Sequence, residues 1–142
     1  MRALLKTPII HPELLYELSK LGHTDVFVIA DAGLPIPPGK KRIDLAFAPG
    51  KPGFLEVLGV VLSNVVVERA VLANEIKDRN PEMHKKILEL IEANKASWKN
   101  FELKYVPHEE FKAVYVASSR FVVRTGEYTP YSNIALVAGV PF

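Results

Sequence analysis

The apolar positions of this chain follow two patterns that alternate along its length. Leucines recur at helical spacing over residues 14–21, with Pro12 suited to the first helical turn and Gly22 to the stop. The run Val26–Ala30 is instead short, continuous and rich in β-branched residues, which is typical of a buried strand. A helix and then a strand are therefore predicted, followed by a proline-rich irregular segment over residues 31–53.

The same two patterns continue toward the C-terminus. They predict helices over residues 54–64, 81–93 and 108–118, and strands over residues 65–72, 101–106, 120–125 and 133–140. Asn80 is expected to cap the helix that Pro81 opens. Strands that alternate with helices predict a single α/β domain over residues 1–142, a layered sandwich with a mostly parallel central sheet flanked by helices.

The composition suits a globular protein and removes several classes of function. Apolar residues make up 49% of the chain, and the net charge of +2 comes from interleaved signs that form no basic stripe. Nucleic acid and membranes are therefore not expected as partners. The absence of cysteine excludes disulfides and cysteine nucleophiles and is compatible with a reducing cytosol. Lys6, Pro8 and His11 interrupt the apolar N-terminal run before it reaches signal-peptide length, so we expect an unprocessed cytoplasmic protein.

Ligands of mostly parallel sheets bind outside the carboxyl ends of the strands, which directs attention to the residues after Ala30 and Val106 and around Tyr131. Asp31 follows the first strand directly, where a carboxylate is able to accept hydrogen bonds from a polyol. A helix cap or a structural turn is the alternative for this aspartate. His108 opens a predicted helix, so it either points toward a site or caps that helix.

Two further segments offer candidate chemistry. The segment Arg124–Leu136 collects arginine, glutamate, tyrosine, threonine, serine and asparagine side chains before an apolar strand. Aromatic faces beside amides and hydroxyls suit a sugar, although a polar surface hairpin is the alternative. His23 lies in a predicted turn, where an imidazole gives and takes protons near neutral pH or is simply a surface residue. We interpret Asp44, by contrast, as structural.

The motifs of several other chemistries are missing. Only Gly33 follows the first predicted strand, where a dinucleotide-binding loop needs three glycines, and prolines remove backbone donors from the PGKPG segment at residues 49–53. The four histidines show no metal-ligand spacing, and His84 falls on a charged helix face where solvation explains it. No serine-nucleophile elbow occurs either. We therefore expect neither a nucleotide nor a metal ion.

Seven segments together resemble one known family. In chain order they are GHTD, IADAGLPIP, RIDLAFAPG, VERAVLANEI, NPE, HEEFK and RTGEYTPYSNIALVAGVPF, and this set is similar to the motifs of the D-ribose pyranase family. The resemblance covers essentially His11 to Phe142. The related L-fucose mutarotases share the fold but are less similar in ADAGLPIP and in RTGEYTPYSN.

The resemblance implies an isomerase that interconverts the pyranose and furanose forms of free D-ribose without a cofactor. It also implies a homodecamer of two stacked pentamers, with sites in clefts between adjacent subunits. His23 matches the catalytic histidine of the family. The residues that match the family's sugar contacts are Asp31, His108, Tyr131, Ser132 and Asn133. Many members carry alanine where this chain has Ser132, a departure that a backbone contact would survive.

Two other functions stay open at this point. A mutarotase of another sugar, such as L-fucose, begins with the same ring opening, so only the subfamily motifs separate it from a pyranase. A non-catalytic sugar-binding protein would use the same cleft, although binding alone does not demand a titrating residue such as His23. We assign no function to the connector around Trp98.

Overall fold

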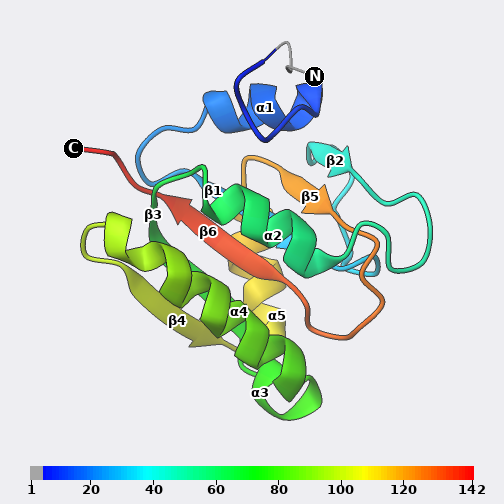
Figure 1. Ribbon diagram of the computed structural model, residues 1–142. Coiled ribbons are helices and arrows are strands. Elements are labelled where there is room, and N and C mark those ends of the chain that lie inside the picture. The colour runs from blue at the N-terminus through cyan, green and yellow to red at the C-terminus, as the bar shows by residue number, and fades with distance from the viewer. Residues whose placement is uncertain (1–4) are drawn as a thin grey trace.

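The computed structural model describes residues 5–142 and places six strands in one sheet (Figure 1). They are β1 (Val26–Ala30), β2 (Arg42–Asp44), β3 (Val67–Ala73), β4 (Glu102–Val106), β5 (Val122–Arg124) and β6 (Ile134–Ala138). Their order across the sheet is β2-β5-β1-β6-β3-β4. Only β6 is antiparallel to its neighbours, β1 and β3, while the other pairs are parallel. The predicted mostly parallel α/β sheet is therefore confirmed.

Helices cover both faces of this sheet. They are α1 (Pro12–Ser19), α2 (Phe54–Leu62), α3 (Ile76–Arg79), α4 (Pro81–Asn94), α5 (His108–Glu110), a short 3₁₀ turn η1 (Lys95–Ser97) and a π-helix η2 (Phe111–Val116). Figure 1 shows α2 and α4 on one face and α5 with η2 on the other. Phe27 and Ile29 of β1 pack into the α2–α4 side of the core, and Val28 packs with Phe111 on the η2 side. The first strand is buried on both faces, which explains its continuous apolar run.

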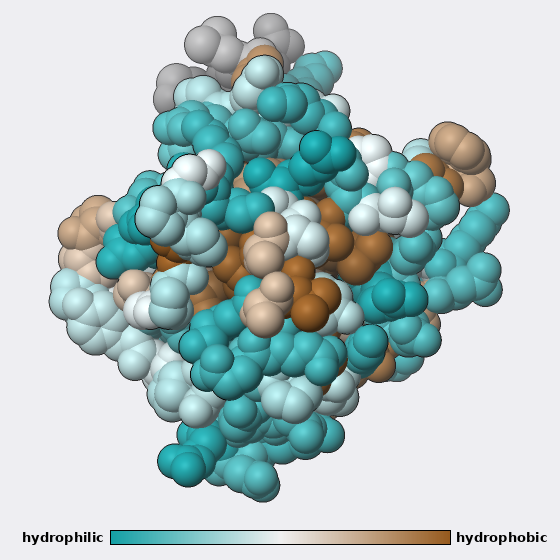
Figure 2. Space-filling model, turned by 180° about the vertical axis from the view of Figure 1, so that it is seen from behind, coloured by the Kyte–Doolittle hydropathy of each residue, from teal (hydrophilic) through white to brown (hydrophobic). Residues whose placement is uncertain are grey.

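The face behind the sheet carries a thinner layer of helix. Figure 2 shows this side, where apolar side chains gather in the middle and hydrophilic side chains form a rim. Val114 of η2 leaves a large apolar side chain exposed, and so do Ile10 and Phe47 outside the helices and strands. No helix within residues 5–142 is long and apolar enough to cross a membrane. Residues 1–4, which belong to the N-terminal run examined for a signal peptide, lie outside the described range.

The structure differs from the sequence predictions in several places, of which four bear on the site or on a predicted residue. The segment predicted as irregular contains β2, which is only three residues long and pairs with β5 at the edge of the sheet. The helix predicted over residues 108–118 is a single α-turn that continues as the π-helix. His84 is half-buried rather than solvated, because its Nε2 is hydrogen-bonded to the Tyr105 hydroxyl at 2.5 Å. Asn80 stands at the N-cap position of α4, but its side chain does not cap that helix.

Candidate functional site

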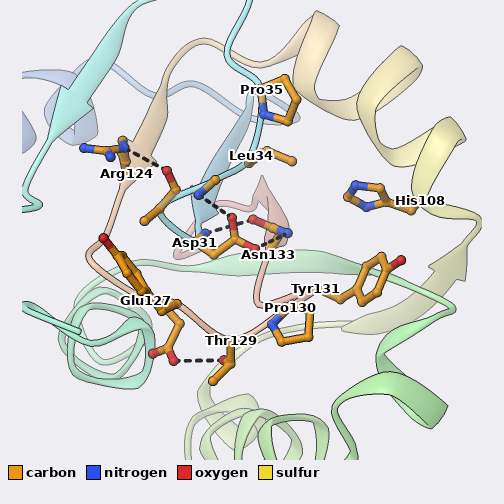
Figure 3. Close-up of a pocket in the computed structure, with 13 residues that line it drawn as sticks. Asp31, Leu34, Pro35, His108, Arg124, Glu127, Thr129, Pro130, Tyr131 and Asn133 are labelled. Atoms are coloured by element: carbon orange, nitrogen blue, oxygen red, sulfur yellow. Dashed lines mark hydrogen bonds between the residues drawn. The ribbon is translucent and has the colours of Figure 1, made fainter. Parts of the chain in front are cut away.

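A cavity of about 630 Å³ opens where β1 and β4 end and β6 begins (Figure 3). Because β6 is antiparallel to β1 and β3, its amino end lies at the same edge of the sheet as the carboxyl ends of the other strands. The volume falls within the roughly 300–1,000 Å³ of small-molecule sites. The lining residues are Asp31, Ala32, Gly33, Leu34, Pro35, His108, Arg124, Glu127, Tyr128, Thr129, Pro130, Tyr131 and Asn133. All three predicted locations, after β1, after β4 and before β6, therefore meet in one cavity.

Asp31 and Asn133 form a reciprocal pair in this cavity. The Asp31 N–H donates to Asn133 Oδ1 at 2.9 Å, and Asn133 Nδ2 donates back to Asp31 Oδ2 at 3.2 Å. The other carboxylate oxygen, Oδ1, accepts from the Gly33 N–H at 3.0 Å. Burial raises the pKa of the Asp31 carboxyl, although these hydrogen bonds oppose the rise. The pair fixes a partly desolvated acceptor at the end of β1.

His108 enters the cavity from the start of α5. Its backbone N–H donates to both carboxylate oxygens of Glu75, at 3.0 and 3.2 Å, so Glu75 rather than the imidazole caps this turn. The ring lies edge-on to Tyr131, with centroids 5.1 Å apart. Nδ1 of His108 is buried without a hydrogen-bond partner among the described residues. Leaving a buried nitrogen without a partner costs about 1–3 kcal/mol, so the placement of this ring carries a cost in stability.

Tyr131 and Ser132 belong to the loop between β5 and β6. Tyr131 has a φ of 58°, in the left-handed region that few non-glycine residues adopt. Ser132 is fully buried, and its hydroxyl is bonded to Thr129 Oγ1 at 2.8 Å and to Asn80 Nδ2 at 3.3 Å. The Ser132 side chain is thus committed to the loop and does not line the cavity.

His23 lies at the other end of the sheet. It precedes β1, whereas Asp31 follows it, and a five-residue strand is about 17 Å long. The His23 ring pairs with Glu68, with Nε2 and Oε1 separated by 2.7 Å, and its side chain is 53% exposed. The turn around it is held by Asp25, which accepts from the Gly22 N–H at 2.8 Å. This hydrogen bond, aided by Arg120, holds the pKa of Asp25 below its ordinary value. Four of the predicted site residues, Asp31, His108, Tyr131 and Asn133, therefore line one cavity, Ser132 lies beside it in the loop, and His23 is remote from it.

Other residues of the cavity were missed as individuals by the sequence analysis. Arg124 Nη1 donates to both carboxylate oxygens of Asp44, at 3.0 and 3.1 Å, and Arg124 Nε donates to the Ala32 carbonyl at 3.1 Å. These bonds agree with a structural role for Asp44. Glu127 accepts from the Phe54 N–H at the start of α2, at 3.0 Å. The polar density of their segment was the available signal. Glu75 offered none, because its partner is 33 residues away.

The chemistry available in this cavity is recognition of a polyol. It offers carboxylate and amide oxygens as acceptors, beside a histidine and a tyrosine side chain. Among the described residues, no group of three or more histidine, cysteine or acidic side chains is placed to hold a metal ion.

Known proteins similar to this chain cover nearly all of it. The model of the RbsD / FucU transport protein family matches residues 4–141. A D-ribose pyranase from Cronobacter sakazakii is 47% identical over 138 residues, which are 96% of this chain and 99% of that protein. A D-ribose pyranase from Histophilus somni is 46% identical over 138 residues, which are again 96% of this chain and 99% of that protein.

Two solved structures are similar in fold as well. Bacillus subtilis RbsD complexed with D-ribose is 42% identical, with a TM-score of 0.88 over 98% of this chain and 100% of that chain. The fucose mutarotase of Streptococcus pneumoniae, in complex with L-fucose, is 27% identical, with a TM-score of 0.80 over 96% of this chain and 99% of that chain. Sequence, fold and coverage agree, and this chain belongs to the RbsD / FucU transport protein family.

Proposed function

We propose that this protein is a D-ribose pyranase, a cofactor-independent isomerase that interconverts the pyranose and furanose forms of free D-ribose. The observation that carries this function is the cavity shared by the Asp31–Asn133 pair and the histidine His108. Carboxylate and amide acceptors beside a histidine in one cavity suit the successive hydroxyls of a sugar. The D-ribose pyranases similar to this chain, and the related RbsD solved with D-ribose, support the same substrate.

Interconversion of the two rings requires proton transfers, the breaking of one carbon–oxygen bond and the formation of another. The anomeric hydroxyl loses its proton as the bond between the anomeric carbon and the ring oxygen breaks, and the ring oxygen gains a proton. A different hydroxyl of the open aldehyde then attacks the carbonyl carbon, losing its proton while the carbonyl oxygen gains one. A positioned acid or base accelerates such steps by about 10²–10⁴-fold. We assign this proton transfer to His23.

His23 acts, in this proposal, in the cavity of an adjacent subunit. Its place at the opposite end of β1 from Asp31 supports this assignment, because one chain alone does not bring the two together. Its ring is exposed and oriented by Glu68, as a group that serves a neighbouring molecule needs to be. Exposed apolar side chains such as Phe47 and Ile10 favour contacts between subunits. We propose that the assembly is the homodecamer of two stacked pentamers that the resemblance to the D-ribose pyranase family implies.

The remaining residues of the cavity bind and orient the sugar. Asp31 and His108 hold hydroxyls, Tyr131 and Asn133 fix the orientation of the ring, and Ser132 contributes through its backbone. Residues 1–142 form one domain in this proposal, which the single six-stranded sheet supports. The protein acts in the cytoplasm, in agreement with a chain that has no cysteine.

Saturation-transfer NMR on free D-ribose tests this function. Irradiation of a pyranose anomeric signal is expected to transfer saturation to the furanose signals faster when the protein is present. His23→Ala should abolish the acceleration and leave the circular dichroism spectrum unchanged. His84→Ala is the matched control, because His84 lies on α4 outside the cavity, and it should retain the acceleration.

Each result decides between named functions. Acceleration for L-fucose but not for ribose would make the protein a mutarotase. Sugar binding without acceleration for any sugar would make it a binding protein. Full activity of His23→Ala would remove His23 from the mechanism while leaving the pyranase function in place.

A further inference from the structure

Tyr131 is held in an unfavourable backbone conformation. Its φ of 58° places a bulky side chain in the left-handed region, where such a conformation costs about 1–3 kcal/mol and persists only if neighbouring contacts impose it. The conformation directs the tyrosine ring toward the His108 ring, edge-on at 5.1 Å (Figure 3). The position of the Tyr131 ring at the cavity therefore depends on whatever braces its turn.

Asn80 supplies that brace from the junction between α3 and α4. Its side-chain Nδ2 donates to the Pro130 carbonyl at 2.9 Å and to the Ser132 hydroxyl at 3.3 Å. These acceptors are the residues immediately before and after Tyr131, 50 and 52 positions along the chain from Asn80. One amide thus fixes both ends of the turn that presents the tyrosine.

Asn80 occupies a helix-capping position but does not cap its helix, which leaves its amide free to brace the Tyr131 turn. Asparagine at an N-cap normally accepts a hydrogen bond from the first turn of its own helix, a contact worth about 1 kcal/mol. Asn80 stands at the N-cap of α4, before Pro81 at the first helical position, yet its side chain makes no capping bond. Departures from local rules that serve a distant turn are expected at functional sites.

We propose that Asn80 is a positioning residue of the sugar site, acting through Tyr131. This role rests on the proposed function, because Tyr131 is assigned there to sugar contact. Asn80 itself does not line the cavity and touches no substrate. Its amide holds the Tyr131 turn in the left-handed conformation, so that the ring meets the sugar without first having to be ordered.

Two substitutions of Asn80 separate positioning from stability. Asn80→Ala removes the two donated bonds and should weaken D-ribose binding about tenfold, as expected for losing hydrogen bonds that order a binding residue. Asn80→Asp also removes the amide donor and should weaken binding at least as much. An aspartate is, however, a good N-cap beside a helix dipole, so Asn80→Asp should melt at a higher temperature than Asn80→Ala. If Asn80 had only a structural role, D-ribose affinity would fall in step with the melting temperature. Weak binding in Asn80→Asp despite its higher melting temperature would therefore indicate positioning.

The matched control is Asn94→Ala at the other end of α4. The Asn94 amide also donates to a carbonyl, that of Leu90 at 2.8 Å, but the bond stays within its own helix. This variant should bind D-ribose as the wild type does. NMR or calorimetric titration with D-ribose gives the dissociation constant of each variant. The dependence of the ring-exchange rate on D-ribose concentration gives KM and kcat separately. The effect of Asn80→Ala should fall on KM.

A double-mutant cycle completes the test. In a Tyr131→Ala background, Asn80→Ala should cause less than about a twofold further loss of D-ribose affinity, because the residue it positions is gone. Wild-type affinity in Asn80→Ala, or losses that simply multiply in the double variant, would overturn the positioning role and leave the pyranase function standing. A wild-type protein that neither binds D-ribose nor accelerates its exchange would instead overturn the proposed function and the role of Asn80 with it.

Discussion

Asp31 combines a requirement of binding with a disadvantage for stability. A carboxylate that is partly withdrawn from water is a strong acceptor for sugar hydroxyls, but its ionised form is less favourable there than in the unfolded chain. Its hydrogen bonds from Gly33 and Asn133 reduce this penalty without cancelling it, since the pKa of Asp31 is raised. Functional residues often carry such a cost in stability.

The raised pKa of Asp31 fixes the sign of a pH effect. Because the folded state binds this proton more tightly than the unfolded state, the contribution of Asp31 to stability falls as pH rises from the ordinary aspartate value through the raised pKa. The amide that the substitution Asp31→Asn introduces cannot ionise. The free energy of unfolding of Asp31→Asn, relative to that of the wild type, should therefore increase between about pH 4 and about pH 7. The same variant should bind D-ribose more weakly. Urea unfolding at both pH values measures the difference, and a constant difference would contradict this expectation.

At the scale of elements, the loop between β5 and β6 forms one unit with the segment before α2. The Gly126 N–H donates to the Pro52 carbonyl at 2.8 Å, and the Gly50 N–H donates to the Gly126 carbonyl at 2.6 Å. A Cβ at Gly126 would lie 2.5 Å from the Lys51 carbonyl oxygen, a contact that the backbone has to move to avoid. Next along the chain, Glu127 caps the start of α2. The close approach of residues 50–52 to Gly126, here called the crossing, anchors the loop that presents Tyr131.

A methyl group at this crossing should be severely destabilising. Gly126→Ala is expected to lower the free energy of unfolding by about 3 kcal/mol, because backbone rather than a flexible side chain occupies the space. Gly59→Ala is the matched control within α2, where the new Cβ would meet only Leu90 Cδ2 at an ordinary 3.8 Å. That variant should gain about 0.5–1 kcal/mol, the helix preference of alanine over glycine. Chemical unfolding at equal subunit concentration tests both; equal stabilities would refute the close crossing.

At the scale of the whole molecule, the groups assigned to the reaction lie at opposite ends of the strands of the sheet. The cavity with Asp31 opens at the carboxyl end of β1, and His23 with Glu68 lies at the amino end. A rigid sheet cannot fold to bring these ends together within one chain. The site is completed, in the proposed assembly, when the His23 end of one subunit meets the cavity of the next.

A split site of this kind permits complementation between inactive subunits. His23→Ala should be inactive alone, and Asp31→Ala should bind D-ribose too weakly to show activity at a sugar concentration near the wild-type KM. After mixed refolding or co-expression, some interfaces combine an intact His23 with an intact cavity, so about a quarter of the wild-type exchange activity should return for random pairing of equal amounts. Saturation-transfer NMR measures the recovery, and native mass spectrometry reports the assembly. No recovery in a confirmed mixed oligomer would show that each site uses residues of one chain.

The sequence alone was sufficient for the elements whose signals are local. The buried run Val26–Ala30 and the helix opened by Pro81 were predicted because apolar period and proline geometry act within a few residues. The locations of the cavity, after Ala30 and Val106 and around Tyr131, followed from the rule for the carboxyl ends of parallel strands. The short edge strand Arg42–Asp44 was missed, since it is specified by its pairing with β5.

What depends on distant partners was decided only by the tertiary structure. Asn80 has the sequence signature of a helix cap, but its amide donates across the chain to the turn of Tyr131. His84, which the charged helix face suggested to be solvated, is half-buried against Tyr105, where burial and nearby Lys77 lower its pKa. The distance between His23 and the cavity is likewise invisible in a linear sequence. Local patterns therefore determined which elements form, and long-range packing determined which side chains meet, because hydrogen bonds and burial depend on proximity in space rather than along the chain.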